Sequence, residues 1–325
     1  MQNLIQETSD SKILFTGLDF AGKTSIITIL QKRFEHIALL KPTKAAQRNV
    51  FEYLGHSIAE WDLGGQQTYR IKYLKHPDKY FDNTHACLYV VDIQDEERTL
   101  EMLSYFKDVV DQFRELEITP SISVLFHKYD PEFVAEQNKA SLDGKIKELE
   151  GNMKTITDGE FSLSFYRTTI KKVWGIFNAF SRIMLSLFPQ SELIDKSIEE
   201  FAKKTDAKGI VVLDNNSLII GQFYTNQQIQ DLIQVSTPYF LTLNDSFSTK
   251  IKEESRAKPK EESDVLNGLN REKRMTINRS GHTFVFDEFF IEKFKVPFYL
   301  LIVKGKEEIN DVEINSFIAT FQTYI

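Results

Sequence analysis

The residues best suited to chemistry lie near the start of the chain, where the segment GLDFAGKT, residues 17–24, fits the pattern G-x-x-x-x-G-K-[S/T]. Glycines let backbone N–H groups close around an anion, and the N-terminus of the following helix adds the positive end of its dipole. A lysine here neutralises phosphate oxygens, and the next hydroxyl ligates Mg²⁺. Gly17 opens this loop, and the candidate phosphate-binding residues are Asp19, Gly22, Lys23, Thr24 and Ser25.

The first loop by itself leaves kinases, ATPases and GTPases open, and a second segment, WDLGGQ at residues 61–66, helps to distinguish them. Asp62 ends a strand-like run, where its carboxylate holds Mg²⁺ through water. The N–H of Gly65 reaches a γ-phosphate because no side chain intervenes. The amide of Gln66 then stands one residue further on, where it orients an attacking water. We therefore take Lys23 and Gln66 as the catalytic candidates.

A third segment, HKYD at residues 127–130, follows an apolar strand and indicates which base is read. The carboxylate of Asp130 accepts two hydrogen bonds from N1–H and N2–H₂ of guanine, whereas adenine offers no matching pair of donors. Lys128 lays its aliphatic stem along the base, and His127 precedes it at the strand end. The expected ligands are GTP and GDP.

Two further segments are candidates for completing the site. In RTTI, residues 167–170, Thr169 and Ile170 close the base pocket, although a plain turn with Thr169 as a helix cap fits the sequence equally well. Between the first two motifs, Thr43 is the best candidate for a threonine that contacts the γ-phosphate and the metal. Thr28 and Thr68 fit less well, because they lie inside or beyond helices. The metal-ligand candidates are Thr24, Thr43 and Asp62.

The elements that must position these residues alternate between strands and helices. Residues 12–16 are strand-like and lead through the glycines into a helical run, while 50–53 and 57–63 flank a turn. Further strands are expected at 85–92, 122–127 and 161–168, the first two each preceded by a segment with helical spacing, and a helix at 171–188 stops at Pro189. This order predicts an α/β fold with a mostly parallel, covered sheet.

After Pro189 the pattern changes to a smaller, separate α/β module. A helix over 194–204 is followed by two strands joined at 214–216 and by a second helix from 227 onward. The charged tract 250–263 reads as an exposed loop. Strands at 283–290 and 297–304 precede a last helix at 311–324. We expect one domain over residues 1–190 and a second over 191–325.

Composition excludes several classes of protein. The 325 residues suit two domains, and 42% hydrophobic with 27% charged residues argue against wholesale disorder. A net charge of −7 makes nucleic acid an unsuitable partner. The single cysteine, Cys87, lies in an apolar run where a buried residue is expected. No run approaches a membrane span, and Gln2 excludes N-myristoylation. We expect a cytoplasmic protein that reaches a membrane only through its partners.

The motifs together resemble a known family. GLDFAGKTS and WDLGGQQTY resemble the Arf branch of Ras-like small GTPases, and Thr43 after Pro42 matches the first switch of that branch. HKYD, RTTI and the tryptophan-containing helix ending in LFP resemble the Rag/Gtr GTPases. The resemblance implies a Ras-like P-loop domain followed by a roadblock or longin-like dimerisation domain. His127 in place of the usual asparagine and the bulky Phe20 depart from the Arf pattern.

The resemblance also implies a function and partners. It implies a switch that binds GTP or GDP with Mg²⁺, hydrolyses GTP slowly, and orders the loops around Thr43 and Gln66 while the γ-phosphate is present. Its partners would be an exchange factor, a GTPase-activating protein, effectors in signalling or trafficking, and a homo- or heterodimer mate bound through the C-terminal domain. Two alternatives stay open: a nucleotide-bound scaffold subunit with little or no GTPase activity, and an ATP-dependent P-loop enzyme.

Overall fold

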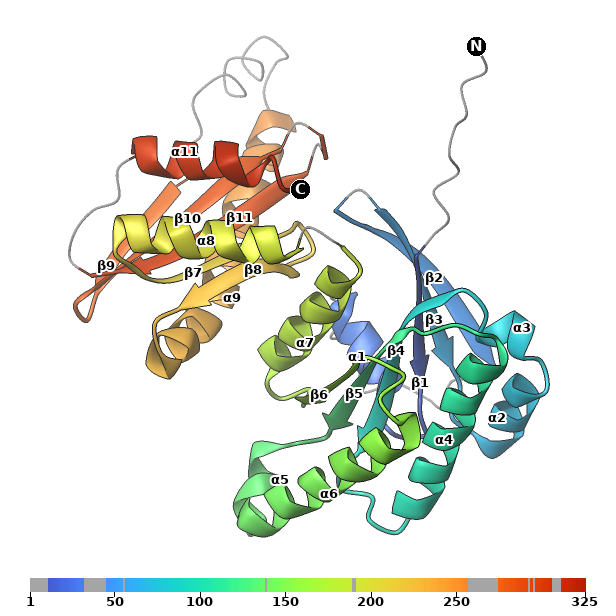
Figure 1. The fold of residues 1–325 in the computed structure, drawn as a ribbon. Helices are drawn as coiled ribbons and strands as arrows, with labels where there is room; N and C mark the ends of the chain where they lie inside the picture. Colours follow the sequence, from blue (N-terminus) through green and yellow to red (C-terminus); the bar gives the residue numbers. More distant parts are fainter. Residues whose placement is uncertain are drawn as a thin grey trace, which may run out of the picture. The chain divides into compact units, whose positions relative to one another are not determined.

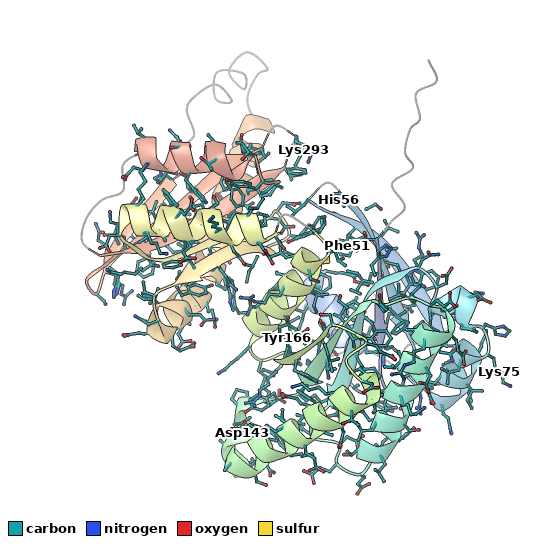
Figure 2. All side chains as sticks on the ribbon, in the orientation of Figure 1. Phe51, His56, Lys75, Asp143, Tyr166 and Lys293 are labelled. Carbon is teal, nitrogen blue, oxygen red and sulfur yellow. The ribbon has the colours of Figure 1, made fainter. Side chains whose placement is uncertain are left out.

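The chain is seen in a computed structural model that describes residues 11–31, 45–54, 56–137, 139–188, 191–256, 274–291, 293–294, 296–305 and 311–325. It divides into two compact units, Met1–Leu187 and Phe188–Ile325, coloured blue to green and yellow to red in Figure 1 and drawn with their side chains in Figure 2. Thr43 and Pro189 lie outside the described residues. Within the described ranges, none of the helices has the length and apolar character that crossing a membrane requires.

The first unit is built on a six-stranded sheet in the order β2-β3-β1-β4-β5-β6. Only β2 runs antiparallel to its neighbour β3, and the other neighbours are parallel, so the predicted mostly parallel sheet is confirmed. The strand bounds are β1 (Ser11–Thr16), β2 (Ala46–Tyr53), β3 (His56–Leu63), β4 (Thr84–Asp92), β5 (Ser121–His127) and β6 (Leu163–Arg167). Because β1, β3, β4, β5 and β6 point the same way, their carboxyl ends share one edge of the sheet.

Helices cover both faces of this sheet. The helices are α1 (Lys23–Leu30), α2 (Gln67–Leu74), α3 (Pro77–Tyr80), α4 (Thr99–Glu115), α5 (Pro131–Glu136), α6 (Lys139–Thr157) and α7 (Val173–Ser186). α4 packs against α6, and α1 packs against α7, as Figure 1 shows. Phe180 of α7 stacks on Phe15 of β1 with ring centroids 6.1 Å apart. Cys87 is fully buried, as predicted, and burial raises the pKa of its thiol.

The second unit has a five-stranded sheet in the order β8-β7-β11-β10-β9, in which all neighbours are antiparallel. Its strands are β7 (Ala207–Leu213), β8 (Ile219–Tyr224), β9 (Arg274–Arg279), β10 (His282–Phe290) and β11 (Pro297–Lys304), and its helices are α8 (Ser191–Thr205), α9 (Gln227–Arg256) and α11 (Asp311–Phe321). The predicted hairpin between β7 and β8 is present, and the Asp214 carboxylate accepts a hydrogen bond from the Leu218 N–H at 2.7 Å.

Two glycines show how the helices cover the second sheet. A Cβ at Gly209 would lie 2.5 Å from Ile229 of α9, and one at Gly221 would lie 2.3 Å from Ile198 of α8. Gly221 pairs with Val212, three residues from Gly209 on β7, so the two glycines face opposite sides of the sheet. Phe201 of α8 stacks on Phe317 of α11 at 4.4 Å. The module is therefore a three-layer sandwich with α8 and α11 on one face and α9 on the other (Figure 1).

Two elements of the second unit differ from the expectation. β9 was not predicted, because its sequence RMTINR is mostly polar and four of its residues are exposed. The charged tract was expected to be a loop, but its first part, residues 250–256, continues α9. Lysine, glutamate and arginine are strong helix formers, and the first proline of the tract is Pro259, so nothing stops the helix earlier. The remainder, 257–263, lies outside the described residues.

Candidate functional site

The loop after β1 has a backbone that only glycine suits at its two ends. Gly17 has φ +134° and Gly22 has φ +97°, and a Cβ at Gly17 would lie 2.3 Å from the Val90 carbonyl oxygen. Phe20, also in the left-handed region at φ +59°, is 67% exposed and so does not fill the loop. The loop therefore leaves its backbone free to line a concave surface at the N-terminus of α1.

Lys23 begins α1 and extends across this loop. Its Nζ donates hydrogen bonds to the carbonyl oxygens of Gly17 at 3.0 Å and Leu18 at 2.7 Å. Burial lowers the pKa of Lys23 to about 8, while the charges of Asp62 and Asp19 act in the opposite direction. Lys23 is therefore mostly protonated at neutral pH and presents a positive charge at the loop. Ser25 follows in the first turn of α1.

Thr24 and Asp62 bring two oxygen ligands together. The Thr24 hydroxyl donates to Oδ2 of Asp62 at 3.1 Å, and Asp62, at the end of β3, is buried at 2% exposure. A hydroxyl beside a carboxylate suits Mg²⁺, which binds few protein oxygens and completes its octahedron with phosphate and water. Among the described residues, no group of three or more His, Cys, Asp or Glu side chains could hold a metal ion.

The segment after β3 contacts the loop after β1 directly. A Cβ at Gly65 would lie 2.2 Å from the backbone nitrogen of Asp19, so this close approach requires glycine. Gln66 caps α2, and its carbonyl oxygen accepts hydrogen bonds from Tyr69 N at 2.9 Å and Arg70 N at 3.0 Å. The structure thus places Gln66 one residue away from the contact between the two loops.

His127 ties three loops together at the end of β5. Its ring packs on Gly22, where a Cβ would lie 2.4 Å from Cδ2, and its Nδ1 lies 3.0 Å from the Thr168 hydroxyl. The side chain is 2% exposed, and burial lowers its pKa to about 4. The ring is therefore neutral at physiological pH. It links the loops through its packing on Gly22 and its hydrogen bond with Thr168, and neither contact needs a charge on the ring.

Asp130 and Thr169 meet although 39 residues separate them. The Thr169 hydroxyl donates to Oδ1 of Asp130 and accepts a hydrogen bond from Lys171 N at 3.1 Å. The residue that caps α7 is Lys172, so the interpretation of Thr169 as a helix cap is wrong. Lys128 has φ +59° and pairs with Asp92 at 2.5 Å, and Ile170 is 38% exposed. The loops after β5 and β6 therefore form one surface.

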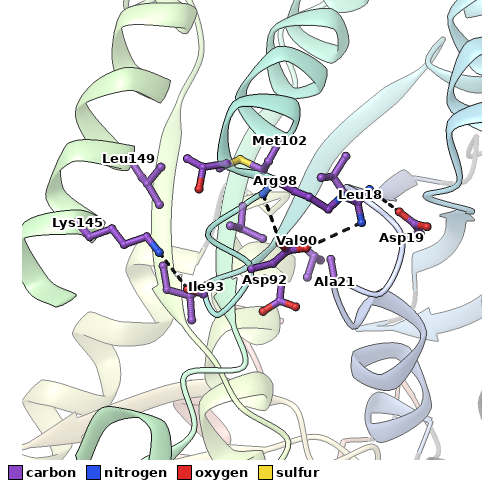
Figure 3. Close-up of a pocket in the computed structure, with 13 residues that line it drawn as sticks. Leu18, Asp19, Ala21, Val90, Asp92, Ile93, Arg98, Met102, Lys145 and Leu149 are labelled. Carbon is purple, nitrogen blue, oxygen red and sulfur yellow. Dashed lines mark hydrogen bonds and ion pairs between the residues drawn. The ribbon is translucent and has the colours of Figure 1, made fainter. Parts of the chain in front are cut away.

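Sequence reasoning missed a cation next to the first loop. Arg98, at the start of α4, donates from Nη2 to Oδ1 of Asp19 at 2.6 Å (Figure 3). The pair lines a hollow of about 390 Å³, including space open to solvent, together with Met102, Lys145 and Leu149. Because 79 residues separate the two partners, no local spacing indicates the contact, and only the parallel order of the strands brings them together.

The first unit has a glycine-containing loop before a helix, an aspartate at the end of a strand and a mostly parallel six-stranded sheet. These features define the Ras-like class of P-loop proteins. Residues 12–239 match the family described as the Gtr1/RagA G protein conserved region. The chain belongs to the Gtr1/RagA family, and it is a GTP-binding protein of the GTPase class.

Individual relatives include both Rag/Gtr proteins and an Arf-like protein, the two groups that the motifs resemble. The chain is 25% identical over 214 residues to Ras-related GTP-binding protein A of Dictyostelium discoideum, covering 64% of this chain and 68% of that protein. It is 23% identical over 226 residues to GTP-binding protein gtr1 of Schizosaccharomyces pombe, covering 66% and 69%. It is 35% identical over 101 residues to ADP-ribosylation factor-like protein 3 of Chlamydomonas reinhardtii, covering 31% and 54%.

Proposed function

We propose that the chain is a nucleotide switch that binds GTP or GDP with Mg²⁺ at the carboxyl edge of the first sheet and hydrolyses GTP slowly. The observation that carries this proposal is the set of contacts that joins four loops: Gly65 on Asp19, His127 on Gly22 and Thr168, and Thr169 on Asp130. Loops that meet in this way offer one continuous surface to a phosphate chain and a base.

Each part of the site has a distinct role in the proposal. Backbone N–H groups of residues 17–25 and the charge of Lys23 bind the phosphates, while Thr24 and Asp62, with Thr43, hold Mg²⁺. When bound, Mg²⁺ neutralises phosphate oxygens. Asp130 reads guanine, with Lys128, Thr169 and Ile170 beside the ring and His127 fixing the loop below it. The short contact between Asp130 and Thr169 keeps the carboxylate in place before a base arrives.

Hydrolysis depends on Gln66 in this proposal. Its amide orients the attacking water, and the Gly65 N–H contacts the γ-phosphate. The reaction should be slow, because Arg98 and Arg70, two arginines that the structure describes near the loop, are already paired with the carboxylates of Asp19 and Glu101. A partner that supplies an arginine would add roughly 10³- to 10⁵-fold in rate.

The second unit serves assembly in the proposal. We place the domain boundary at residues 190 and 191 and assign 191–325 to a roadblock or longin-like dimerisation domain, supported by its antiparallel sheet with helices on both faces. Homo- or heterodimerisation through this domain would accompany nucleotide-dependent binding of an exchange factor, a GTPase-activating protein and effectors. The protein would act in the cytoplasm and reach membranes through these partners.

Single-turnover hydrolysis of GTP tests the proposal. Gln66→Leu should lower the rate constant roughly tenfold or more, because the attacking water loses its positioning group. The dissociation constant for a GTP analogue should stay within about threefold, since no phosphate-binding group is lost. Gln228→Leu, an exposed residue of α9 in the second unit, is the matched control and should hydrolyse like wild type. Equal rates for wild type and Gln66→Leu would reject the catalytic role.

A further inference from the structure

Arg98, the N-cap residue of α4, and Glu101, in the first turn of that helix, connect the helix after Gln66 to the loop after β1. Oε1 of Glu101 accepts a hydrogen bond from Nη2 of Arg70 on α2. Its other oxygen, Oε2, accepts one from Nε of Arg98 at 2.8 Å. The Nη2 of Arg98 then reaches Oδ1 of Asp19 at 2.6 Å, as Figure 3 shows. The Glu101 carboxylate therefore accepts hydrogen bonds from two arginines, and the Arg98 guanidinium donates hydrogen bonds to two carboxylates. We call this pair the α4 bracket.

Arg70, at one end of this chain of contacts, is held by a second route. Its guanidinium carbon lies 4.9 Å from the ring centroid of Tyr105 on α4. The Tyr105 hydroxyl lies 3.0 Å from the hydroxyl of Thr16, the residue before Gly17. Arg70 is only 7% exposed, and its backbone N–H donates to the carbonyl of Gln66. The turn that carries Gln66 is thus joined both to Asp19 within the loop after β1 and to Thr16, which precedes that loop.

We propose that the α4 bracket sets the position of Gln66 relative to the phosphates, so that Arg98 and Glu101 act as positioning residues for GTP hydrolysis. This inference rests on the proposed function, because it takes Gln66 as the group that orients water. Neither bracket residue needs to touch nucleotide. Their effect passes through Asp19, whose backbone packs on Gly65, and through Arg70, whose backbone holds Gln66.

An ordinary surface ion pair would have no such effect. Exposed pairs contribute little to stability, and many contribute nothing measurable. Here Arg98 and Glu101 are 30% and 40% exposed, but they are joined at one end to a buried arginine and at the other to the loop itself. Arg98 uses two different nitrogens of its planar guanidinium, Nε and Nη2, on two carboxylates. Lysine carries the same charge at a single point and does not reproduce that geometry.

The ionisation of the network agrees with this arrangement. Hydrogen bonds from Arg98, and then from Arg70, lower the pKa of the Glu101 carboxyl despite some desolvation. Glu101 therefore stays charged at neutral pH and counters both cations. Replacing it by glutamine leaves a neutral acceptor between two guanidinium groups, which favours their separation.

The test measures single-turnover hydrolysis for Arg98→Lys, Arg98→Ala, Glu101→Gln and the double variant Arg98→Ala/Glu101→Gln. Each single variant should lose roughly tenfold in rate, with the dissociation constant for a GTP analogue changed less than about threefold. The double variant should lose no more than the more severe single variant, because groups that act as a unit are not additive. Guanidinium ion at millimolar concentration should restore part of the rate in Arg98→Ala and none in Arg98→Lys.

Matched controls come from another arginine of α4 and its carboxylate partner outside that helix. Arg114 pairs with Glu160 at 2.6 Å and is 32% exposed, so Arg114→Lys and Glu160→Gln remove a similar pair away from the loops and should hydrolyse within twofold of wild type. Thermal unfolding midpoints report whether each variant is folded, and the part-exposed bracket residues are chosen over buried Arg70 for that reason.

The outcomes separate this inference from the function on which it rests. If Gln66→Leu hydrolyses as wild type does, the proposed catalytic role fails and the inference fails with it. If Gln66→Leu is slow but folded Arg98→Lys and Glu101→Gln hydrolyse within twofold of wild type, the bracket is overturned while the proposed function stands. A strictly multiplicative loss in the double variant would also overturn the bracket, since it would show two independent effects.

Discussion

At the scale of single residues, His127 shows how a neutral side chain links the site. The imidazole is buried against Gly22 and bonded to Thr168. Its pKa is lowered from 6.5 to about 4 by burial, so the folded chain resists protonation that the unfolded chain accepts. The ring therefore makes the site sensitive to acid, although it takes no part in the proposed hydrolysis.

The acid sensitivity of His127 can be measured. Between pH 6.5 and pH 4 the unfolded state binds more protons at this residue than the folded state does. The histidine's contribution to stability is therefore complete above pH 6.5 and falls as pH drops through this window, by about 3 kcal/mol in total. Denaturant unfolding of wild type and His127→Asn at several pH values should show their stability difference shifting in favour of the asparagine variant as pH falls.

Comparing His127→Asn with wild type separates the effect of His127 on stability from the opposite effect of Glu60. Burial raises the pKa of Glu60 to about 7, so Glu60 favours the folded state as pH falls from 7 toward 4.5 and masks part of the effect in wild type alone. The exposed His76 supplies the control, and His76→Asn should follow wild type across the window. A stability difference between His127→Asn and wild type that does not change with pH would contradict the burial of a neutral ring.

Residue types and spacing predicted Lys23, Asp62, Gln66 and Asp130, because each belongs to a motif that follows a strand at a fixed distance. Sequence could not find Arg98, because its contact with Asp19 depends on the order of the strands and not on neighbouring residues. A spacing of three residues, as between Arg98 and Glu101, allows a side-chain contact at the start of a helix. That spacing gives no indication that Arg98 also contacts the loop after β1.

At the scale of elements, the sequence pattern located the strands of the first unit and helix α7 to within a few residues, whereas α2, α3 and α5 were not predicted as separate helices. Buried strands such as β4 and β5 read as apolar runs, since a covered parallel sheet has no solvent face. The predictions for the second unit failed for elements that are not buried strands of this kind. β9 is an edge strand with exposed side chains, and α9 extends into a charged tract that composition alone assigned to a loop.

α9 also contains an element-scale test, because Pro238 lies inside it. A proline within a helix removes one N–H donor and crowds the preceding turn, at a cost of roughly 3 kcal/mol in an unstrained helix. Pro238 is exposed, so Pro238→Ala should raise the free energy of unfolding of the second unit by about 1–3 kcal/mol. Differential scanning calorimetry measures the change.

A second proline of the same unit provides the comparison. Pro297 is the first residue of β11, a position that tolerates proline, so Pro297→Ala should change stability by less than about 0.5 kcal/mol. A Pro238→Ala variant no more stable than Pro297→Ala would mean that α9 gains from the bend that proline imposes.

At the scale of the whole molecule, the two compact units should unfold separately, and nucleotide should stabilise only one of them. The proposed ligand contacts come entirely from residues 17–170. With GDP and Mg²⁺ at about 100 times the dissociation constant, the first unit should gain about 2.7 kcal/mol. Calorimetry should show two transitions, of which one moves to higher temperature with nucleotide. A single transition that moves as a whole would contradict independent units.

The lone sulfhydryl has a practical consequence for all of these experiments. Cys87 is sealed inside the central sheet and its ionised form is disfavoured, so peroxide and maleimide find little reactive thiolate on the folded chain. A cysteine introduced at any exposed position would then be the preferred point of attachment for a fluorophore or spin label. Site-specific labelling of this protein therefore does not require Cys87 to be replaced first.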